Sequence, residues 1–155
     1  MMKKWFTAVL VGLVLISGGA GVGYAFSTYE KPSIKLADGT TFSGGVIRID
    51  PSKGVYLHTN DTHHSRGIKA VSIDSRTGGI RVTRDTMDAI VSVSADPDES
   101  LSARNITTGI SGGGVTTIVF FYQNGRQLNL NDKTDYAKIA SSTSNFWISW
   151  ISEPR

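Results

Sequence analysis

The stretch Val115–Leu130 reads VTTIVFFYQNGRQLNL and predicts a β-hairpin at the heart of the fold. Its Asn124-Gly125 pair is the strongest short hairpin signal, because a type I′ turn needs two residues that tolerate positive φ. Side chains alternate between the two faces of a strand. With these two residues as the loop, Phe121 opposes Leu128 and Val119 opposes Leu130, and we predict that this apolar face belongs to the core: Val119, Phe121, Leu128 and Leu130.

The other face of this hairpin is half apolar and needs cover. It holds three apolar and two polar side chains: Ile118, Phe120 and Tyr122 opposite Gln127 and Asn129. The cover is either a second layer of the domain or a partner. The best candidate within the chain is the tail, which predicts a helix of two or three turns after Asp132 and a last strand over Asn145–Ile151.

The rest of the chain predicts a mostly β domain. Short runs of β-branched residues alternate with turn signals at the spacing typical of a sandwich or barrel. Further strands are predicted at residues 34–36, 46–49, 55–58, 68–73, 80–84, 89–95 and 101–108. We therefore expect a small β-sandwich or partly open barrel of about eight or nine strands with one short C-terminal helix. It forms a single domain over residues 33–155, after a linker at 27–32.

Residues 1–26 have the pattern of an export segment. Lys3 and Lys4 precede an apolar run that begins at Trp5 and ends at Ile16, followed by small residues up to Ala25. A positive start, an apolar run of this length and small residues before a cut are the signature of a cleaved signal peptide. Cleavage is expected after Ala25 or Ala20.

A retained membrane anchor is the alternative for the same residues. The stretch Trp5–Tyr29 contains no charged residue in 25, and about 20 apolar residues suffice to cross a bilayer. Gly19 and Gly23 form a G-x-x-x-G pair that allows close helix packing. Both alternatives leave the N-terminus in the cytoplasm and the domain outside it, so the expected location is secreted or single-pass membrane-anchored.

Composition excludes several classes of function. The chain has a formal charge of +3, but two of its 16 basic residues are Lys3 and Lys4, which leaves 14 against 13 acidic residues. A near-neutral domain lacks the field that nucleic-acid binding requires, so we predict no nucleic-acid partner. There is no cysteine, which excludes disulfides, thiol catalysis and cysteine metal sites.

One glycine-rich motif resembles a serine-protease signature. The stretch Gly109–Gly113 has the G-x-S-G-G shape found around the serine of chymotrypsin-like proteases, with Ser111 at its centre. Possible partners precede it in the order of that class: His63 or His64, then Asp85 or Asp88. However, a nucleophile elbow needs a helix after the serine, whereas Val115 begins a predicted strand. We therefore predict no catalytic residues, with a small secreted hydrolase as the alternative function.

Three histidines form the only metal-capable cluster in the sequence: His58, His63 and His64, with Asp61 among them. Imidazole suits zinc, copper or nickel. His58 ends a predicted strand, while His63 and His64 are adjacent in a polar loop, and a metal site needs three or four ligands in fixed geometry. We predict no metal site and no cofactor, and these histidines are only weak candidate ligands.

The aromatic residues of the last third give the predicted binding residues: Phe120, Tyr122 and Trp147. Tryptophan and tyrosine are favoured as binding anchors, whereas Trp150 shares a strand face with Phe146 and is predicted to be buried.

The sequence thus predicts a non-enzymatic extracytoplasmic interaction, inhibitor or accessory module with a protein partner at the cell envelope. A third alternative is a self-assembling surface subunit, because seven basic and three acidic residues between Arg48 and Arg84 precede five acidic residues between Asp85 and Glu99.

Overall fold

The computed structural model describes residues 32–58 and 65–154. The predicted membrane residues Lys3, Lys4, Trp5, Gly19 and Gly23 lie outside this part of the chain, so the export segment stays a prediction. Within the described residues, no helix is both long enough and apolar enough to cross a bilayer.

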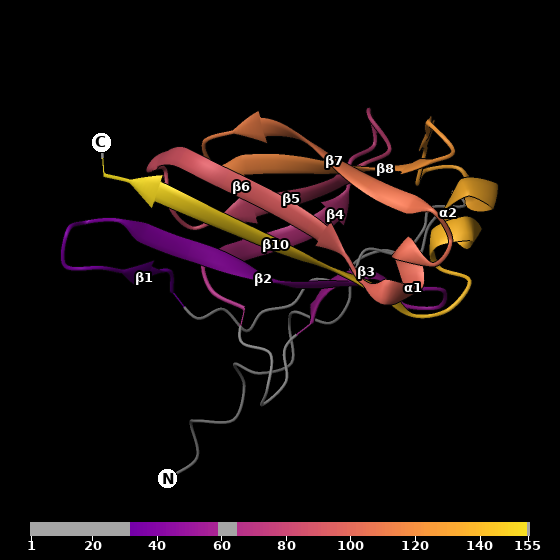
Figure 1. Ribbon diagram of the computed structural model, residues 1–155, viewed down its shortest axis with the longest axis horizontal. Helices are drawn as coiled ribbons and strands as arrows, with labels where there is room; N and C mark the ends of the chain where they lie inside the picture. The colour runs from indigo at the N-terminus through magenta and orange to yellow at the C-terminus, as the bar shows by residue number, and fades with distance from the viewer. Residues whose placement is uncertain (1–31, 59–64, 155) are drawn as a thin grey trace, which may run out of the picture.

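Ten strands form two five-stranded sheets that face each other (Figure 1). In sheet A the order is β1-β2-β10-β6, with β3 also paired to β2; its strands are β1 (Ile34–Lys35), β2 (Thr41–Asp50), β3 (Gly54–His58), β6 (Ala89–Pro97) and β10 (Ser144–Glu153). In sheet B the order is β4-β5-β8-β7, with β9 also paired to β8; its strands are β4 (Ile68–Ile73), β5 (Ile80–Arg84), β7 (Ile106–Gly113), β8 (Thr116–Gln123) and β9 (Arg126–Leu128). All the pairings are antiparallel. Within the described residues no strand of one sheet pairs with a strand of the other, so the fold is not a closed barrel.

The predicted hairpin is confirmed at its turn. Phe121 pairs with Leu128, and the left-handed turn is made by Asn124 and Gly125, with φ of 52° and 77°. The predicted pairing of Val119 with Leu130 is wrong, because β9 ends at Leu128 and Val119 pairs instead with Ile80 of β5 and Ile110 of β7. All four predicted core residues of the hairpin are nevertheless buried.

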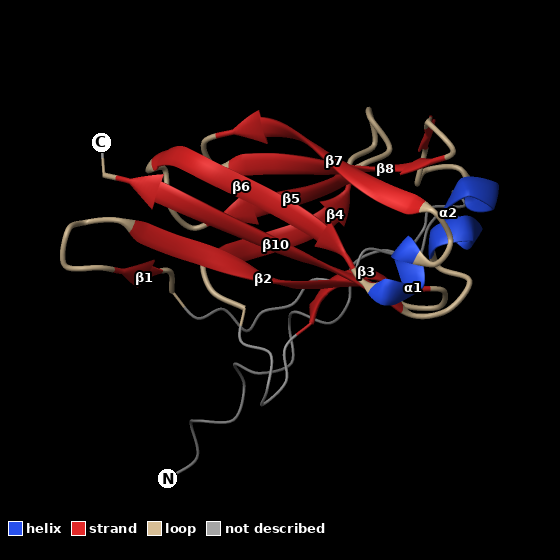
Figure 2. Cartoon of the chain, in the orientation of Figure 1, coloured by secondary structure: helices blue, strands red, loops and turns tan. Residues whose placement is uncertain are grey.

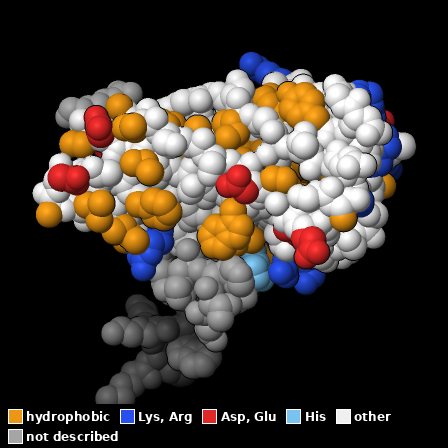
Figure 3. Space-filling view, viewed as in Figure 1, with side chains coloured by type: hydrophobic (Ala, Val, Ile, Leu, Met, Phe, Trp, Pro, Cys, Tyr) orange, Lys and Arg blue, Asp and Glu red, His pale blue; other side chains and the backbone are white. Residues whose placement is uncertain are grey.

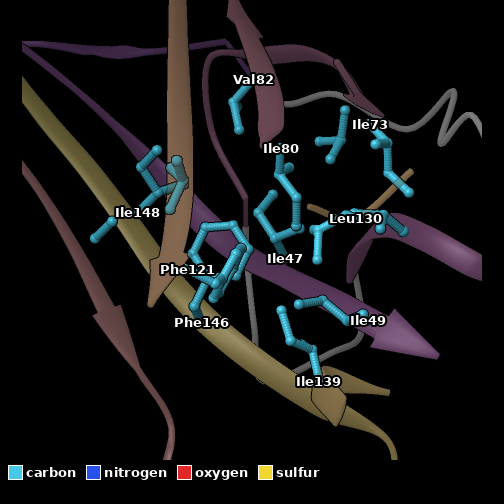
Figure 4. Packing of buried hydrophobic residues seen from close by; sticks show 14 of the residues in the cluster. Ile47, Ile49, Ile73, Ile80, Val82, Phe121, Leu130, Ile139, Phe146 and Ile148 are labelled. Carbon is cyan, nitrogen blue, oxygen red and sulfur yellow. The ribbon is translucent and has the colours of Figure 1, made fainter. Parts of the chain in front are cut away.

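The core lies between the two sheets and draws on both (Figure 4). Sheet A contributes the inward residues Ile47 and Phe146, and sheet B contributes Ile80 and Phe121. The rings of Phe121 and Phe146 meet edge to face across the interior, with their centroids 5.4 Å apart. Such aromatic contacts add to the hydrophobic gain from burial.

The tail does not cover the hairpin, contrary to the prediction. β10 lies between β2 and β6 in the middle of sheet A. Its even-numbered side chains Phe146, Ile148 and Trp150 are fully buried because they point into the space between the sheets. A strand whose inward face is mostly apolar is placed best at the centre of a sheet, where both of its edges are also paired.

Two short helices lie at one end of the molecule (Figure 2): α1 (Glu99–Ser102) and α2 (Lys133–Ile139). The single predicted C-terminal helix corresponds to α2, and Asp132 caps it by accepting from the backbone N–H groups of Thr134 and Asp135. The helix α1 was not predicted, and it replaces the start of the strand expected at 101–108. Asp98 causes the change, since its carboxylate caps the turn through the N–H of Leu101.

Asp74 holds the turn between β4 and β5 together. Its carboxylate pairs with the guanidinium of Arg81 and also accepts from the backbone N–H and hydroxyl of Thr77, both at 2.9 Å. These interactions, with the Arg81 hydrogen bond the largest, lower the pKa of Asp74 from 3.8 to about 2. The lowered pKa means that the ionised carboxylate stabilises the folded state at neutral pH.

Replacing Asp74 by asparagine should therefore lower the free energy of unfolding at pH 7 by about 1.5–3 kcal/mol, the value of hydrogen bonds to a charged group. In the wild type this contribution is complete above the unfolded pKa of 3.8 and is lost as the pH falls towards 2. Urea unfolding at pH 7, 4 and 2.5 would show a difference between variant and wild type that shrinks on the acid side. Glu153→Gln is the control, and a difference independent of pH would contradict the prediction.

Candidate interaction surface

The three predicted binding residues do not lie together. Phe120 and Tyr122 are half-buried on the outer face of sheet B, since Thr117, Val119 and Phe121 of the same strand point inward. Trp147 is 49% exposed on the outer face of sheet A. The structure therefore separates the predicted set into two surfaces on opposite sides of the sandwich.

On sheet B the aromatic residues pack on their own sheet, beside glycines. A Cβ added at Gly109 would lie 2.9 Å from Cε2 of Tyr122, and one added at Gly79 would lie 3.1 Å from Cδ1 of Phe120. The missing side chains of these glycines leave the space that the rings fill. This packing helps to half-bury both rings, and it makes sheet B the weaker candidate surface.

The outer face of sheet A carries the exposed hydrophobic side chains. In the register of the strands, Ile34 of β1 lies opposite Phe42 of β2, and Phe42 lies opposite Ile151 of β10. These three side chains are 40%, 42% and 44% exposed. Opposed side chains in antiparallel strands are in contact distance, so they form one apolar row across three strands.

Three more exposed hydrophobic residues lie at the same end of the sheet. Leu36 follows β1, Met87 precedes β6, and Val91 occupies the register shift between β6 and β10, where it is 58% exposed. Figure 3 shows hydrophobic side chains gathered over this end, where Figure 1 places the β1–β2 turn and the end of β10. We call this set the apolar end: Ile34, Leu36, Phe42, Met87, Val91 and Ile151.

Trp147 belongs to a second row on the same face. It lies opposite Val46 of β2 on one side and Asp96 of β6 on the other. Between the two rows lie small residues: Gly44 opposite Ser149, and Ser149 opposite Ser94. The hydroxyls of Ser94 and Ser149 are 3.1 Å apart, so the rows are separated by a small, polar strip.

Arg84 fills the interior beneath the apolar end and was missed as a structural residue. Its side chain is fully buried. Its Nε donates to the carbonyl of Gly114 at 3.0 Å, its Nη1 donates to the hydroxyl of Ser152 at 2.7 Å, and its guanidinium lies 5.7 Å from the ring centroid of Trp150. Burial lowers the pKa of Arg84. The sequence did indicate that Arg84 is buried, because alternation along the strand places it on the same face as the apolar residues Ile80 and Val82.

Of the residues of the alternative serine site, the structure describes Ser111, Asp85 and Asp88. Ser111 lies within β7, opposite Ile118 of β8, and not on a turn before a helix. The carboxylate of Asp85 accepts from the N–H and hydroxyl of Ser33, at 3.2 and 2.6 Å, and that of Asp88 accepts from the hydroxyl of Thr41 at 3.0 Å. The carboxylate of Asp85 thus binds the residue just before β1, and that of Asp88 binds the first residue of β2.

Of the three histidines, the structure describes only His58, at the end of β3 opposite Val46; His63 and His64 lie outside the described residues. Within the described part of the chain, no group of three histidine, cysteine or acidic residues could hold a metal ion.

Comparisons with protein-family models, curated proteins and solved structures found no significant match to the chain.

Proposed function

We propose that this protein is a non-enzymatic, extracytoplasmic interaction module at the cell envelope, either secreted or anchored by its N-terminal segment. One observation carries the proposal: all seven exposed large hydrophobic residues within the described chain lie on or directly beside sheet A, and none on sheet B. Soluble monomers rarely expose contiguous apolar patches larger than a few hundred Å², and patches above this size mark interaction sites. The outer face of sheet A is thus the binding face.

Trp147 is the proposed anchor for a protein partner. It projects from β10, which is paired on both edges, so its backbone position is rigid. Asp96 beside it and the Ser94–Ser149 hydroxyl pair supply polar groups around the indole. A large aromatic side chain with polar groups at its rim is the usual composition of a binding hot spot.

Replacing Trp147 by alanine should weaken partner binding by roughly 30-fold or more, the effect of losing a hot spot of about 2 kcal/mol. The measurement is quantitative capture of the partner from crosslinked envelope preparations, followed by titration of the purified partner. Phe120→Ala is the matched control, since it removes an aromatic side chain from the opposite sheet. Equal binding by wild type and the Trp147 variant would contradict the proposed face.

A further inference from the structure

We propose that the apolar end of sheet A rests on the surface of a lipid bilayer, so that one face of the sandwich meets lipid and protein partner at different rows. This inference rests on the proposed location at the envelope, and it goes further by naming what the apolar end contacts. The occupant is a zwitterionic lipid surface, argued from the position of the row, its distance from the charge-free segment and the charges around it.

The geometry of the apolar end suits a flat partner. Ile34, Phe42 and Ile151 lie side by side on three neighbouring strands, and neighbouring strands are about 4.8 Å apart. Leu36 and Met87 extend the set into the two chain turns at this end. Apolar side chains on a rigid edge, next to turns, can enter the boundary between headgroups and acyl chains without a change of fold.

The sequence places this row close to a membrane. Tyr29 ends the charge-free run, and Ile34 follows five residues later. A fully extended chain spans at most about 3.4 Å per residue, so the two are within about 17 Å. If the segment is retained as a span, the apolar end cannot leave the neighbourhood of the bilayer. Even a weak apolar attraction is then sufficient, since tethering raises the effective concentration.

The charges at this end select the type of lipid. Among the described residues at this end, Lys35 is basic, and the acidic residues are Asp38, Asp85, Asp88 and Glu153. These charges do not make the cluster of basic residues that anionic lipids attract. Binding should thus depend on apolar contact and be insensitive to salt. Trp147 lies four residues along the paired strand from Ile151, which is about 13 Å, so its row stays above the lipid surface and open to a protein.

The absence of cysteine allows a direct test on the full chain. A polarity-sensitive dye is attached to Val91→Cys at the apolar end or, as the control, to Thr107→Cys on the exposed outer face of sheet B. Each protein is reconstituted into phosphatidylcholine vesicles. We expect a blue-shifted emission and roughly threefold less quenching by iodide at position 91 than at position 107. The difference should persist at high salt and be lost when Phe42→Ser and Ile151→Ser are added.

Four results would overturn the proposal. A chain that does not float with the vesicles lacks the tether, and equal quenching at both positions means that the apolar end faces water. A shift at both positions indicates adsorption of the whole surface. A shift at position 91 that disappears at low protein density assigns the apolar end to a second copy of the chain. In each case, capture of a partner through Trp147 separately decides the fate of the proposed function.

Discussion

Replacing Trp150 by alanine should lower the free energy of unfolding by about 3–5 kcal/mol, the range for a buried aromatic side chain. Its indole is fully buried in the space between the sheets. The variant removes three things at once: the packing of the largest core side chain, the hydrogen bond from Nε1 to the hydroxyl of Thr117 at 3.0 Å, and the ring beneath the guanidinium of Arg84. A loss of this size is a large part of the stability of a small domain.

Urea unfolding followed by far-UV circular dichroism measures this effect. Trp147→Ala is the matched control, because it removes the same side chain three positions earlier, on the outward face of the same strand. We expect the control to change the free energy of unfolding by less than about 1 kcal/mol. If the two variants were equally destabilised, the inward and outward assignment of β10 would be wrong.

Replacing Arg84 by alanine should cost about 3 kcal/mol or more, comparable to removing one partner of a buried charged network. The guanidinium donates to the carbonyl of Gly114, the carbonyl of Asp88 and the hydroxyl of Ser152. Its hydrogen-bond partners within the described residues are thus uncharged oxygens. Alanine would leave the buried hydroxyl of Ser152 and the partly buried carbonyls of Gly114 and Asp88 without this donor, and it would open a cavity above Trp150.

Two variants separate the shape of Arg84 from its charge. Arg84→Lys retains the charge but not the planar fork of donors, so we expect a substantial loss of stability that is smaller than that of alanine. Arg76→Ala, at an exposed position in the turn before β5, is the control and should stay within about 0.5 kcal/mol of the wild type. Wild-type stability of Arg84→Ala in urea titrations would contradict the role assigned to this residue.

The sequence predicted the fold class and the individual strands and helices better than it predicted which strands pair with one another. Asn124-Gly125 dictates its own turn, and alternation in β10 correctly predicts that Phe146 and Trp150 are buried. Pairing between distant segments is not encoded locally. The apolar face of β10 fits the interior of either sheet, and only the three-dimensional arrangement places it between β2 and β6.

The binding face was harder to predict than the core. Phe120 and Trp147 both lie on outward faces of their strands, and the sequence does not show that these faces point in opposite directions. The apolar row of Ile34, Phe42 and Ile151 was missed, because its members come from three segments that meet only through strand register. An exposed isoleucine and a buried one have the same appearance in a short strand.

The central place of β10 in sheet A has a consequence for the synthesis of the protein. Arg48 and Asn145 are 97 residues apart in the sequence, yet the Nε of Arg48 donates to the side-chain oxygen of Asn145 at 3.0 Å, and their strands are neighbours. Until β10 has been synthesised, β2 and β6 have a gap between them, and sheet A cannot be completed. The protein therefore completes its fold only after nearly all of the chain has been made.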